Sequence, residues 1–190
     1  MPLTETNDIA ARVGVLPYET SDGLDAAVSE AVDYLRARGI AVAGLLQRFG
    51  DAGPGGKQAM WVEDIGTGQI IRLDQPRGPG AIACTFDTAA LARAAYLLQT
   101  ATESGAELLL VNRFGSVEAE GRGLRPEIAE AICSGLAVLI PVRVSLLPAL
   151  EAFLGGPATR LPASAPAIEA WAEALFPRIA ARARSPAVVA

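Results

Sequence analysis

The stretch that decides the fold is residues 12–46, RVGVLPYETSDGLDAAVSEAVDYLRARGIAVAGLL. It opens with a short apolar run, Arg12–Leu16, which predicts a β-strand. Apolar residues then recur at i, i+3, i+4 and i+7 through Leu24–Arg38, which predicts a helix with Asp22 as its N-cap. A second apolar run, Ile40–Leu46, completes a β-loop-α-β unit. Such a unit implies parallel strands joined by a right-handed crossover.

The sequence after this unit predicts further strands of the same sheet. The apolar runs Glu107–Asn112 and Leu136–Val142 predict two more buried strands, parallel to the first two. Ahead of both runs, Gln58–Leu73 carries the turn Ile65-Gly66-Thr67-Gly68, which is typical of a β-hairpin that extends an edge or protrudes. The expected fold class is α/β, a three-layer P-loop-NTPase-like sheet, mostly parallel, with helices on both faces and a hairpin insert. Helices are expected at 87–104, 125–134, 145–154 and 168–183, and a short strand at 81–86.

Length and composition limit the class of protein. The 190 residues suit one domain, expected at 11–183, with tails at 1–10 and 184–190, and 51% hydrophobic residues is typical of a packed globular protein. The polar, acidic start carries no signal peptide pattern, and no apolar run is long enough to span a bilayer. We therefore expect a cytoplasmic protein without a membrane partner, in which Cys84 and Cys133 are buried, reduced thiols. Whether the protein forms a homo-oligomer is left open.

The charged residues narrow the chemistry. A formal net charge of −5, without any dense Lys/Arg cluster, argues against nucleic acid as a partner. The chain contains no histidine, which removes Ser-His-Asp and Cys-His nucleophile systems and most zinc sites, and no metal ligand set is predicted. Any chemistry must use carboxylates, arginines, backbone amides or a borrowed cofactor. The cofactor is left unidentified, and a nucleotide with Mg²⁺ fits the layout.

Ligands of such sheets bind beyond the carboxyl ends of the strands, which singles out the loops 17–23, 47–56, 113–123 and 143–145. The first loop occupies the P-loop position but lacks the lysine and hydroxyl of G-x-x-x-x-G-K-[ST]. Its helix N-terminus favours an anion, with an ordinary capped turn as the alternative. The glycine-rich part of the second loop is interpreted as a surface loop. Candidate ligand-binding residues in these two loops are Tyr18, Thr20, Ser21, Asp22, Gly23, Gln47 and Arg48.

The third loop, with Asn112 before it, reads NRFGSVEAEGRG. It presents Asn112 and Arg113 where a Walker B strand ends in Asp-Glu, and it favours a functional role over a solvated connection. Glutamate–arginine contact is predicted to order the loop while another arginine faces residues 17–23. The candidates for anion contact are Arg113, Arg122 and Arg125, and Glu118 and Glu120 would hold a cation or orient these arginines.

Three strings carry a family resemblance: VNRFGSVEAEGRG at 111–123, VAGLLQR at 42–48 and WVEDIGTGQIIR at 61–72. They resemble a bacterial family of unknown function that is encoded near molybdenum transport and nitrogenase genes. This family looks like a divergent branch of the THEP-type P-loop nucleoside-triphosphatases. The resemblance covers roughly residues 12–155 and implies the P-loop fold. The chain departs from the triphosphatases at both catalytic motifs, which puts inherited hydrolysis in doubt.

The leading hypothesis is a nucleotide- or oxyanion-binding protein of degenerate P-loop ancestry, acting in molybdenum or metal-cofactor metabolism on a small anionic ligand. One alternative is an active nucleoside-triphosphatase with an atypical phosphate loop, in which Glu118 activates water and Glu120 or Asp22 holds a cation. The other is a non-catalytic interaction module whose apolar segment 114–117 meets a partner protein. Hydrolysis of ATP and GTP is predicted to be weak or absent.

Overall fold

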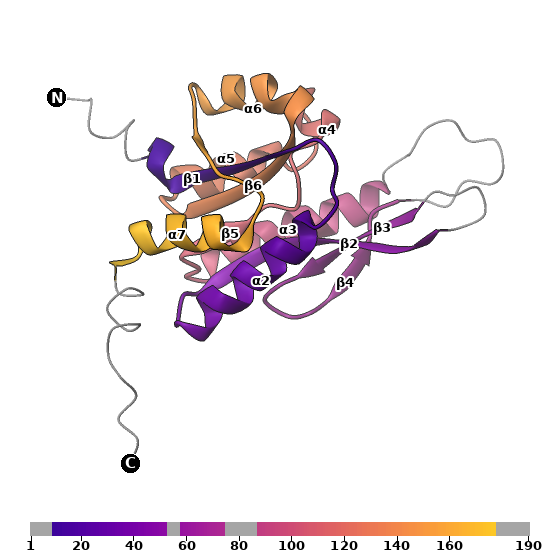
Figure 1. Cartoon of the computed structure of the whole chain (residues 1–190). Coiled ribbons are helices and arrows are strands. Elements are labelled where there is room, and N and C mark those ends of the chain that lie inside the picture. The colour runs from indigo at the N-terminus through magenta and orange to yellow at the C-terminus, as the bar shows by residue number, and fades with distance from the viewer. Residues whose placement is uncertain (1–8, 53–57, 75–86, 178–190) are drawn as a thin grey trace, which may run out of the picture.

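The computed structural model describes residues 9–52, 58–74 and 87–177, which form a sheet with helices on both faces (Figure 1). In the described part the sheet has seven strands in the order β4-β3-β2-β5-β6-β1-β7. The strands are β1 (Val13–Tyr18), β2 (Val42–Ala52), β3 (Gln58–Asp64), β4 (Ile70–Arg72), β5 (Leu108–Leu110), β6 (Ala137–Arg143) and β7 (Thr159–Arg160). The helices are α2 (Leu24–Ala37), α3 (Thr88–Glu103), α4 (Ser116–Ala119), α5 (Arg125–Cys133), the 3₁₀ turn η1 (Val144–Leu146), α6 (Leu147–Leu154) and α7 (Ala165–Leu175).

The parallel core agrees with the sequence prediction. β2 pairs with β5, β5 with β6, and β6 with β1, all in parallel, so the four predicted strands lie in one sheet. Their side chains are buried because helices cover both faces, which is why these runs are apolar on successive residues rather than alternating. The mostly parallel α/β fold with P-loop-like architecture is thereby confirmed.

The hairpin extends one edge of this core, as predicted. β2 pairs antiparallel with β3, and β3 pairs antiparallel with β4. β2 leaves β5 at Gly44, where φ is +114° and a Cβ would lie 2.1 Å from the carbonyl oxygen of Leu110. Only glycine permits this close backbone approach. Beyond it β2 continues to Ala52, so the β2–β3 ribbon projects past the carboxyl edge of the parallel strands (Figure 1).

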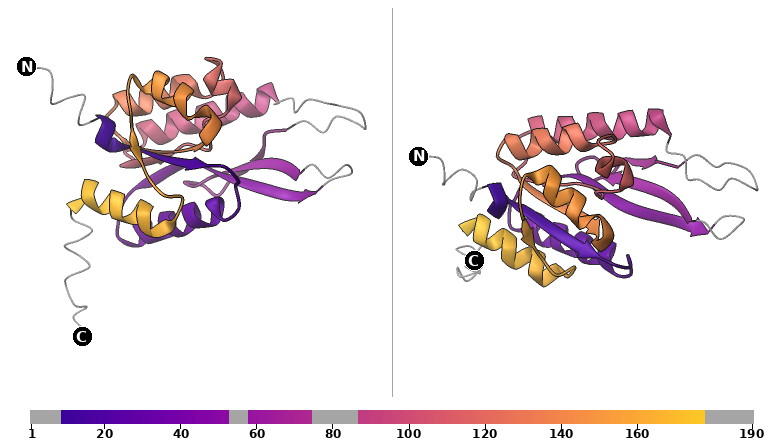
Figure 2. Two further views of the ribbon diagram at one scale, coloured as in Figure 1. Left: turned by 45° about the horizontal axis from the view of Figure 1, so that its top comes forward. Right: turned by 90° about the horizontal axis from the view of Figure 1, so that it is seen from above.

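Two helical layers enclose the sheet. α2 and α7 lie on one face, and α3, α5 and α6 lie on the other (Figure 2). The connection after β1 runs over α2 toward β2, whereas the connection after β6 runs over α6 toward β7. Neighbouring strands whose connections leave in opposite directions form a topological switch point, where ligands of open α/β sheets bind. Here that point is the carboxyl edge between β1 and β6.

Several local expectations need correction. Asp22 is not the N-cap of α2: Gly23 is, in a left-handed conformation at φ +74°, and the Asp22 side chain is exposed one residue outside the helix. α7 begins at Ala165 rather than 168, because Ser164 is extended and a proline fits the first helical turn. Cys133 is exposed at the end of α5 rather than buried. Cys84 and the strand expected at 81–86 fall outside the described residues.

Within the described ranges, no helix has the length and apolar character that a membrane crossing requires.

Candidate functional site

A cluster of charged and aromatic side chains lies at the switch point. Tyr18 ends β1 in register with Arg143 at the end of β6. The Tyr18 side chain packs on the α2 face and is only 7% exposed. Two guanidinium groups lie near its ring, with Arg143 at 5.7 Å and Arg113 at 5.0 Å from the ring centroid. Contacts of this kind stabilise a cation next to an aromatic ring.

Arg113 links three elements of the fold. Its Nη2 donates to both carboxylate oxygens of Asp25, at 2.8 and 2.9 Å, and its Nη1 donates to the Tyr18 hydroxyl at 3.3 Å. The Arg113 and Asp25 side chains are 13% and 23% exposed. At this depth a charge-assisted pair is stronger than a surface ion pair. The pair therefore fixes the start of α2 against the segment that follows β5.

The charges at this place are reversed relative to a working P-loop. Gly23-Leu24-Asp25 lead into α2 at the positions that a P-loop fills with Gly-Lys-[Ser/Thr]. Leu24 is 2% exposed in the core, so it replaces the phosphate-binding lysine with an apolar contact. The carboxylate thus stands on the loop side and the cation on the strand side, where a Walker B acid would be.

This arrangement does not fit a magnesium–nucleotide site of the Walker type. The carboxylate in the first turn of α2, Asp25, is held by Arg113. Among the described residues, no three His, Cys, Asp or Glu side chains gather as a metal ligand set. Mg²⁺ is bound in such proteins by carboxylate, hydroxyl and phosphate oxygens around a free coordination position. The cofactor that the layout admitted is not supported by the side chains.

Asn112 precedes Arg113 at the carboxyl end of β5 and is only 9% exposed. Its Oδ1 is buried and has no hydrogen-bond partner among the described residues. Leaving a buried acceptor unsatisfied costs about 1–3 kcal/mol, so such an atom in a native structure needs a physical explanation. A donor supplied by a ligand is one.

Arg143 is the accessible cation of the cluster. Its side chain is exposed, and its Nη1 makes one long hydrogen bond, 3.5 Å, to the backbone carbonyl of Glu19. It therefore reaches over the first loop from β6. A guanidinium in this position can bind the oxygens of an anion with little cost of desolvation.

The loop after β5 mostly satisfies its own charges. Glu118 is 7% exposed, and its carboxylate accepts hydrogen bonds from the backbone amides of Gly115 at 2.9 Å and Leu124 at 3.1 Å. Arg125 donates to the Glu118 carbonyl at 3.2 Å and covers the Phe153 ring. The Glu118 carboxylate therefore holds the loop together through its own backbone amides.

The predicted glutamate–arginine contact is present as the exposed pair Glu120–Arg122. Arg113 is the arginine of this loop that contacts residue 18 of the first loop. Of the apolar segment 114–117, Phe114 is 1% exposed and stacks on Phe153 with ring centroids 5.9 Å apart, whereas Ser116 is exposed and Val117 is half-buried. The interaction hypothesis that rests on this segment stays a prediction.

The other candidates lie apart from the cluster. Gln47 is 2% exposed, and its amide donates to the carbonyls of Arg48 and Trp61, which joins β2 to β3. Arg48 pairs with Glu63 at 2.8 Å on the hairpin. In the first loop Ser21 is half-buried, and the exposed members are Thr20, Asp22 and Gly23.

Two residues of the cluster were missing from the candidates. Asp25 stands at the hydroxyl position of the P-loop pattern, so the failed match itself pointed to it. Arg143 directly follows a buried strand, in a loop that the carboxyl-edge rule had already marked. Chain spacing alone could not show that both converge on Tyr18.

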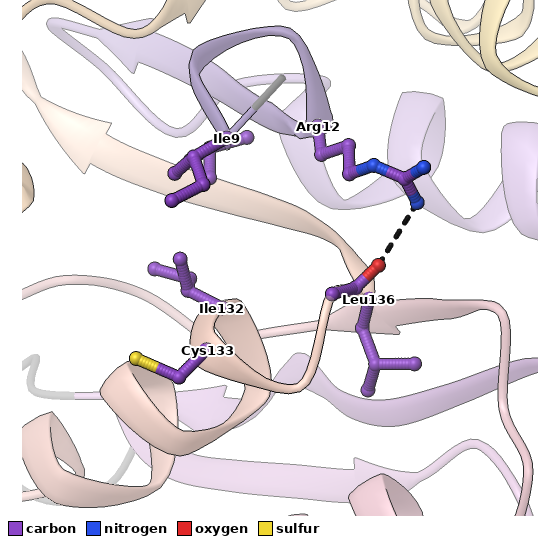
Figure 3. A pocket seen from close by; sticks show the side chains of 7 residues that line it. Ile9, Arg12, Ile132, Cys133 and Leu136 are labelled. Carbon is purple, nitrogen blue, oxygen red and sulfur yellow. Dashed lines mark hydrogen bonds between the residues drawn. The ribbon is translucent and has the colours of Figure 1, made fainter. Parts of the chain in front are cut away.

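A cavity of about 350 Å³ lies elsewhere, at the amino ends of β1 and β6 (Figure 3). Ile9, Ile132 and Leu136 line it with Cys133, and its one charged side chain, Arg12, donates to the Gly135 carbonyl at 2.9 Å. It is largely apolar and lies at the opposite edge of the sheet from the charged cluster. We therefore place the candidate site at the cluster and not at this cavity.

Comparison with known proteins gives the chain a family. None of the solved structures matches it. It is 36% identical over 171 residues to "Molybdenum import ATP-binding protein ModC 2" of Bradyrhizobium diazoefficiens. This alignment covers 90% of the chain but 19% of that relative, so the chain spans about a fifth of the relative's length. Residues 13–171 match the family described as "Protein of unknown function (DUF2478)", and the chain belongs to that family.

Proposed function

We propose that this protein is a non-hydrolytic binding module that holds an oxyanion, free or as the phosphate of a nucleotide, at the carboxyl ends of β1 and β6. The observation that carries the proposal is the convergence of Arg113 and Arg143 on Tyr18 at the topological switch point. Guanidinium groups bind phosphate-like and molybdate-like anions through directed hydrogen bonds. The uncapped N-terminus of α2 adds a favourable dipole.

The proposed biological setting is molybdenum import. The relative is named as an ATP-binding protein of that process, and the homologous segment is about a fifth of it. In this chain the segment has no lysine or hydroxyl at the P-loop positions. We therefore propose that it evolved from a P-loop nucleoside-triphosphatase, of the THEP-type branch, into a sensor or accessory module for an ATP-driven importer.

Ligand binding tests the proposal directly. We expect phosphate, molybdate or ATP to raise the melting temperature, because a ligand that binds only the folded state stabilises it. Isothermal titration calorimetry then gives the affinity. Arg143→Ala should weaken binding about tenfold or more, the size of a lost charge-assisted contact. Arg93→Ala, an exposed arginine of α3, is the matched control and should bind like the parent.

The absence of both heat and thermal shift with all three ligands, at millimolar concentration, would remove the binding proposal. An equal affinity of the parent and Arg143→Ala would remove this location for it.

Assays of ATP and GTP hydrolysis test whether the protein is non-hydrolytic. We expect little or no turnover of ATP or GTP, because neither a P-loop lysine nor a metal-binding hydroxyl neutralises the developing charge. The Glu118 carboxylate, the only base considered from the sequence, bonds to two backbone amides. Steady-state turnover that Glu118→Gln abolishes without unfolding the protein would favour the nucleoside-triphosphatase instead.

A further inference from the structure

We propose that the cluster of Tyr18, Asp25, Arg113 and Arg143 selects oxyanions that still carry a proton, namely inorganic phosphate near neutral pH and phosphomonoesters at mildly acidic pH, over fully deprotonated tetrahedral anions such as sulfate and molybdate. This inference rests on the proposed function and specifies its ligand class. The selecting residue is Asp25, which has no assigned role in the binding described above.

The first argument is the position of the Asp25 carboxylate. Both of its oxygens lie within 2.9 Å of the Arg113 Nη2. An anion that binds the same guanidinium comes into contact with a carboxylate of like charge. Two anionic oxygens repel at this distance, but a proton between them turns the repulsion into a short hydrogen bond. An anion with its own O–H can therefore bind beside Asp25, whereas one without it must displace Asp25.

Asn112 provides an independent second observation. Its buried Oδ1 is an acceptor without a partner among the described residues, one residue before Arg113. An amide oxygen can only accept. Like Asp25, it is matched by a ligand that donates a hydrogen bond.

The remaining polar groups of the cluster complete the proposed binding site for such a ligand. Arg113 and Arg143 provide positive charge from the ends of β5 and β6. The Tyr18 hydroxyl oxygen accepts from Arg113, which leaves the hydroxyl proton to donate elsewhere. The proposed binding site thus contains hydrogen-bond donors for anionic oxygens and acceptors for one ligand proton. Near neutral pH phosphate retains such a proton, whereas sulfate and molybdate retain none.

The test is a calorimetric comparison of inorganic phosphate, sulfate and molybdate at about pH 7. We expect the parent to bind phosphate at least about tenfold more tightly than either other anion, which corresponds to one hydrogen bond replacing a repulsion. Asp25→Asn should reduce this ratio to about threefold or less, since an asparagine can donate its amide to an unprotonated oxygen. Asp33→Asn removes the same charge from an exposed position of α2 and should keep the parent's ratio.

A second measurement needs no variant. A phosphomonoester loses its last proton with a pKa of about 6, so AMP should bind the parent less tightly as the pH rises from about 5.5 to 8. Inorganic phosphate keeps a proton over most of that range and should change less. The chain has no histidine, so the commonest titrating side chain does not complicate the comparison.

The outcomes separate the two proposals. Similar parent affinities for all three anions would overturn the proton selection and leave the binding module in place. A phosphate preference that survives in Asp25→Asn, or AMP affinity that does not fall with pH, would also overturn it. If the parent binds none of the anions, the proposed function itself fails.

Discussion

Glu118 and Asp25 are two carboxylates at the same edge of one sheet, and their partners differ. Glu118 bonds to the backbone amides of Gly115 and Leu124, within its own loop. Asp25 bonds to the guanidinium of Arg113, which follows a different strand. A carboxylate saturated by nearby amides holds a loop in shape. One that is paired with a side chain from another element ties the two elements together.

The comparison shows why charge in a loop is an ambiguous signal. The sequence predicts a functional role for residues 113–123 because two glutamates and two arginines lie there beside three glycines. In the structure Glu118 bonds to backbone amides of its own loop and Glu120 pairs with Arg122 at the surface, whereas Arg113, the first residue of the loop, contacts Tyr18 and Asp25. The other members of the cluster come from the ends of β1 and β6 and from the start of α2, where the sequence has fewer conspicuous charges.

The largest expected effect tests whether the loop after β5 is anchored as a structural unit. Phe114→Ala removes a 1% exposed ring that stacks on Phe153. It should destabilise the protein by about 3–5 kcal/mol, the usual cost of a buried aromatic cavity. Urea denaturation measures this change in unfolding free energy. A loss below about 1 kcal/mol would mean that this segment is exposed in solution and would support its role as a partner surface.

The matched pair Glu118→Gln and Asp25→Asn tests the comparison itself. Glu118→Gln places an amide group against two backbone donors and should cost about 3 kcal/mol of stability. Asp25→Asn keeps an acceptor for Arg113 and should cost about 1 kcal/mol. Chemical denaturation of both variants gives the difference. Equal losses would show that Asp25 is as structural as Glu118.

Glycine at 123 sharpens the same point. Gly123 has φ +66°, and a Cβ there would lie 2.1 Å from the Glu118 Oε1. Gly123→Ala should therefore cost about 2 kcal/mol, from backbone strain and displacement of the carboxylate. Gly121 also has a positive φ, but a Cβ there meets nothing within 4 Å, so Gly121→Ala should cost about half as much. Equal melting temperatures for the two variants would contradict the contact with Glu118.

The smallest effect concerns a third carboxylate, Asp74, which bonds to both kinds of partner. Its carboxylate accepts hydrogen bonds from the Arg72 guanidinium and from the Met60 amide. These bonds hold the pKa of Asp74 below its ordinary value, and the bond from Arg72 contributes most. A lowered pKa in the folded state stabilises the protein at pH values above the unfolded pKa of about 4. That contribution is lost as the pH falls through the folded value.

Asp74→Asn should therefore cost about 1 kcal/mol near neutral pH, the net worth of such hydrogen bonds. The difference from the parent should shrink in urea titrations as the solution is acidified below about pH 4. Asp33→Asn, exposed on α2, serves as the control. A difference that stays constant down to low pH would remove the ionised Asp74 from the explanation.

The sequence alone determined the sheet, its parallel core and the hairpin, because these depend on local periodicity and on apolar runs that need two covering layers. It also predicted the candidate site at the carboxyl edge, since β-loop-α-β connections put their loops there. The absence of histidine argued against Ser-His-Asp and Cys-His nucleophile systems and most zinc sites, and the absence of the P-loop lysine argued against a standard P-loop.

Only the tertiary structure decided which charges meet. Residues 18, 25, 113 and 143 are brought together by the strand order β5-β6-β1 and by the short connection from β1 to α2. Helix caps and the partner of Glu118 likewise depended on backbone geometry that no residue pattern specifies. A charged side chain has several partners within reach along the chain. The folded surroundings choose among them by burial and distance, on which the strength of each pair depends.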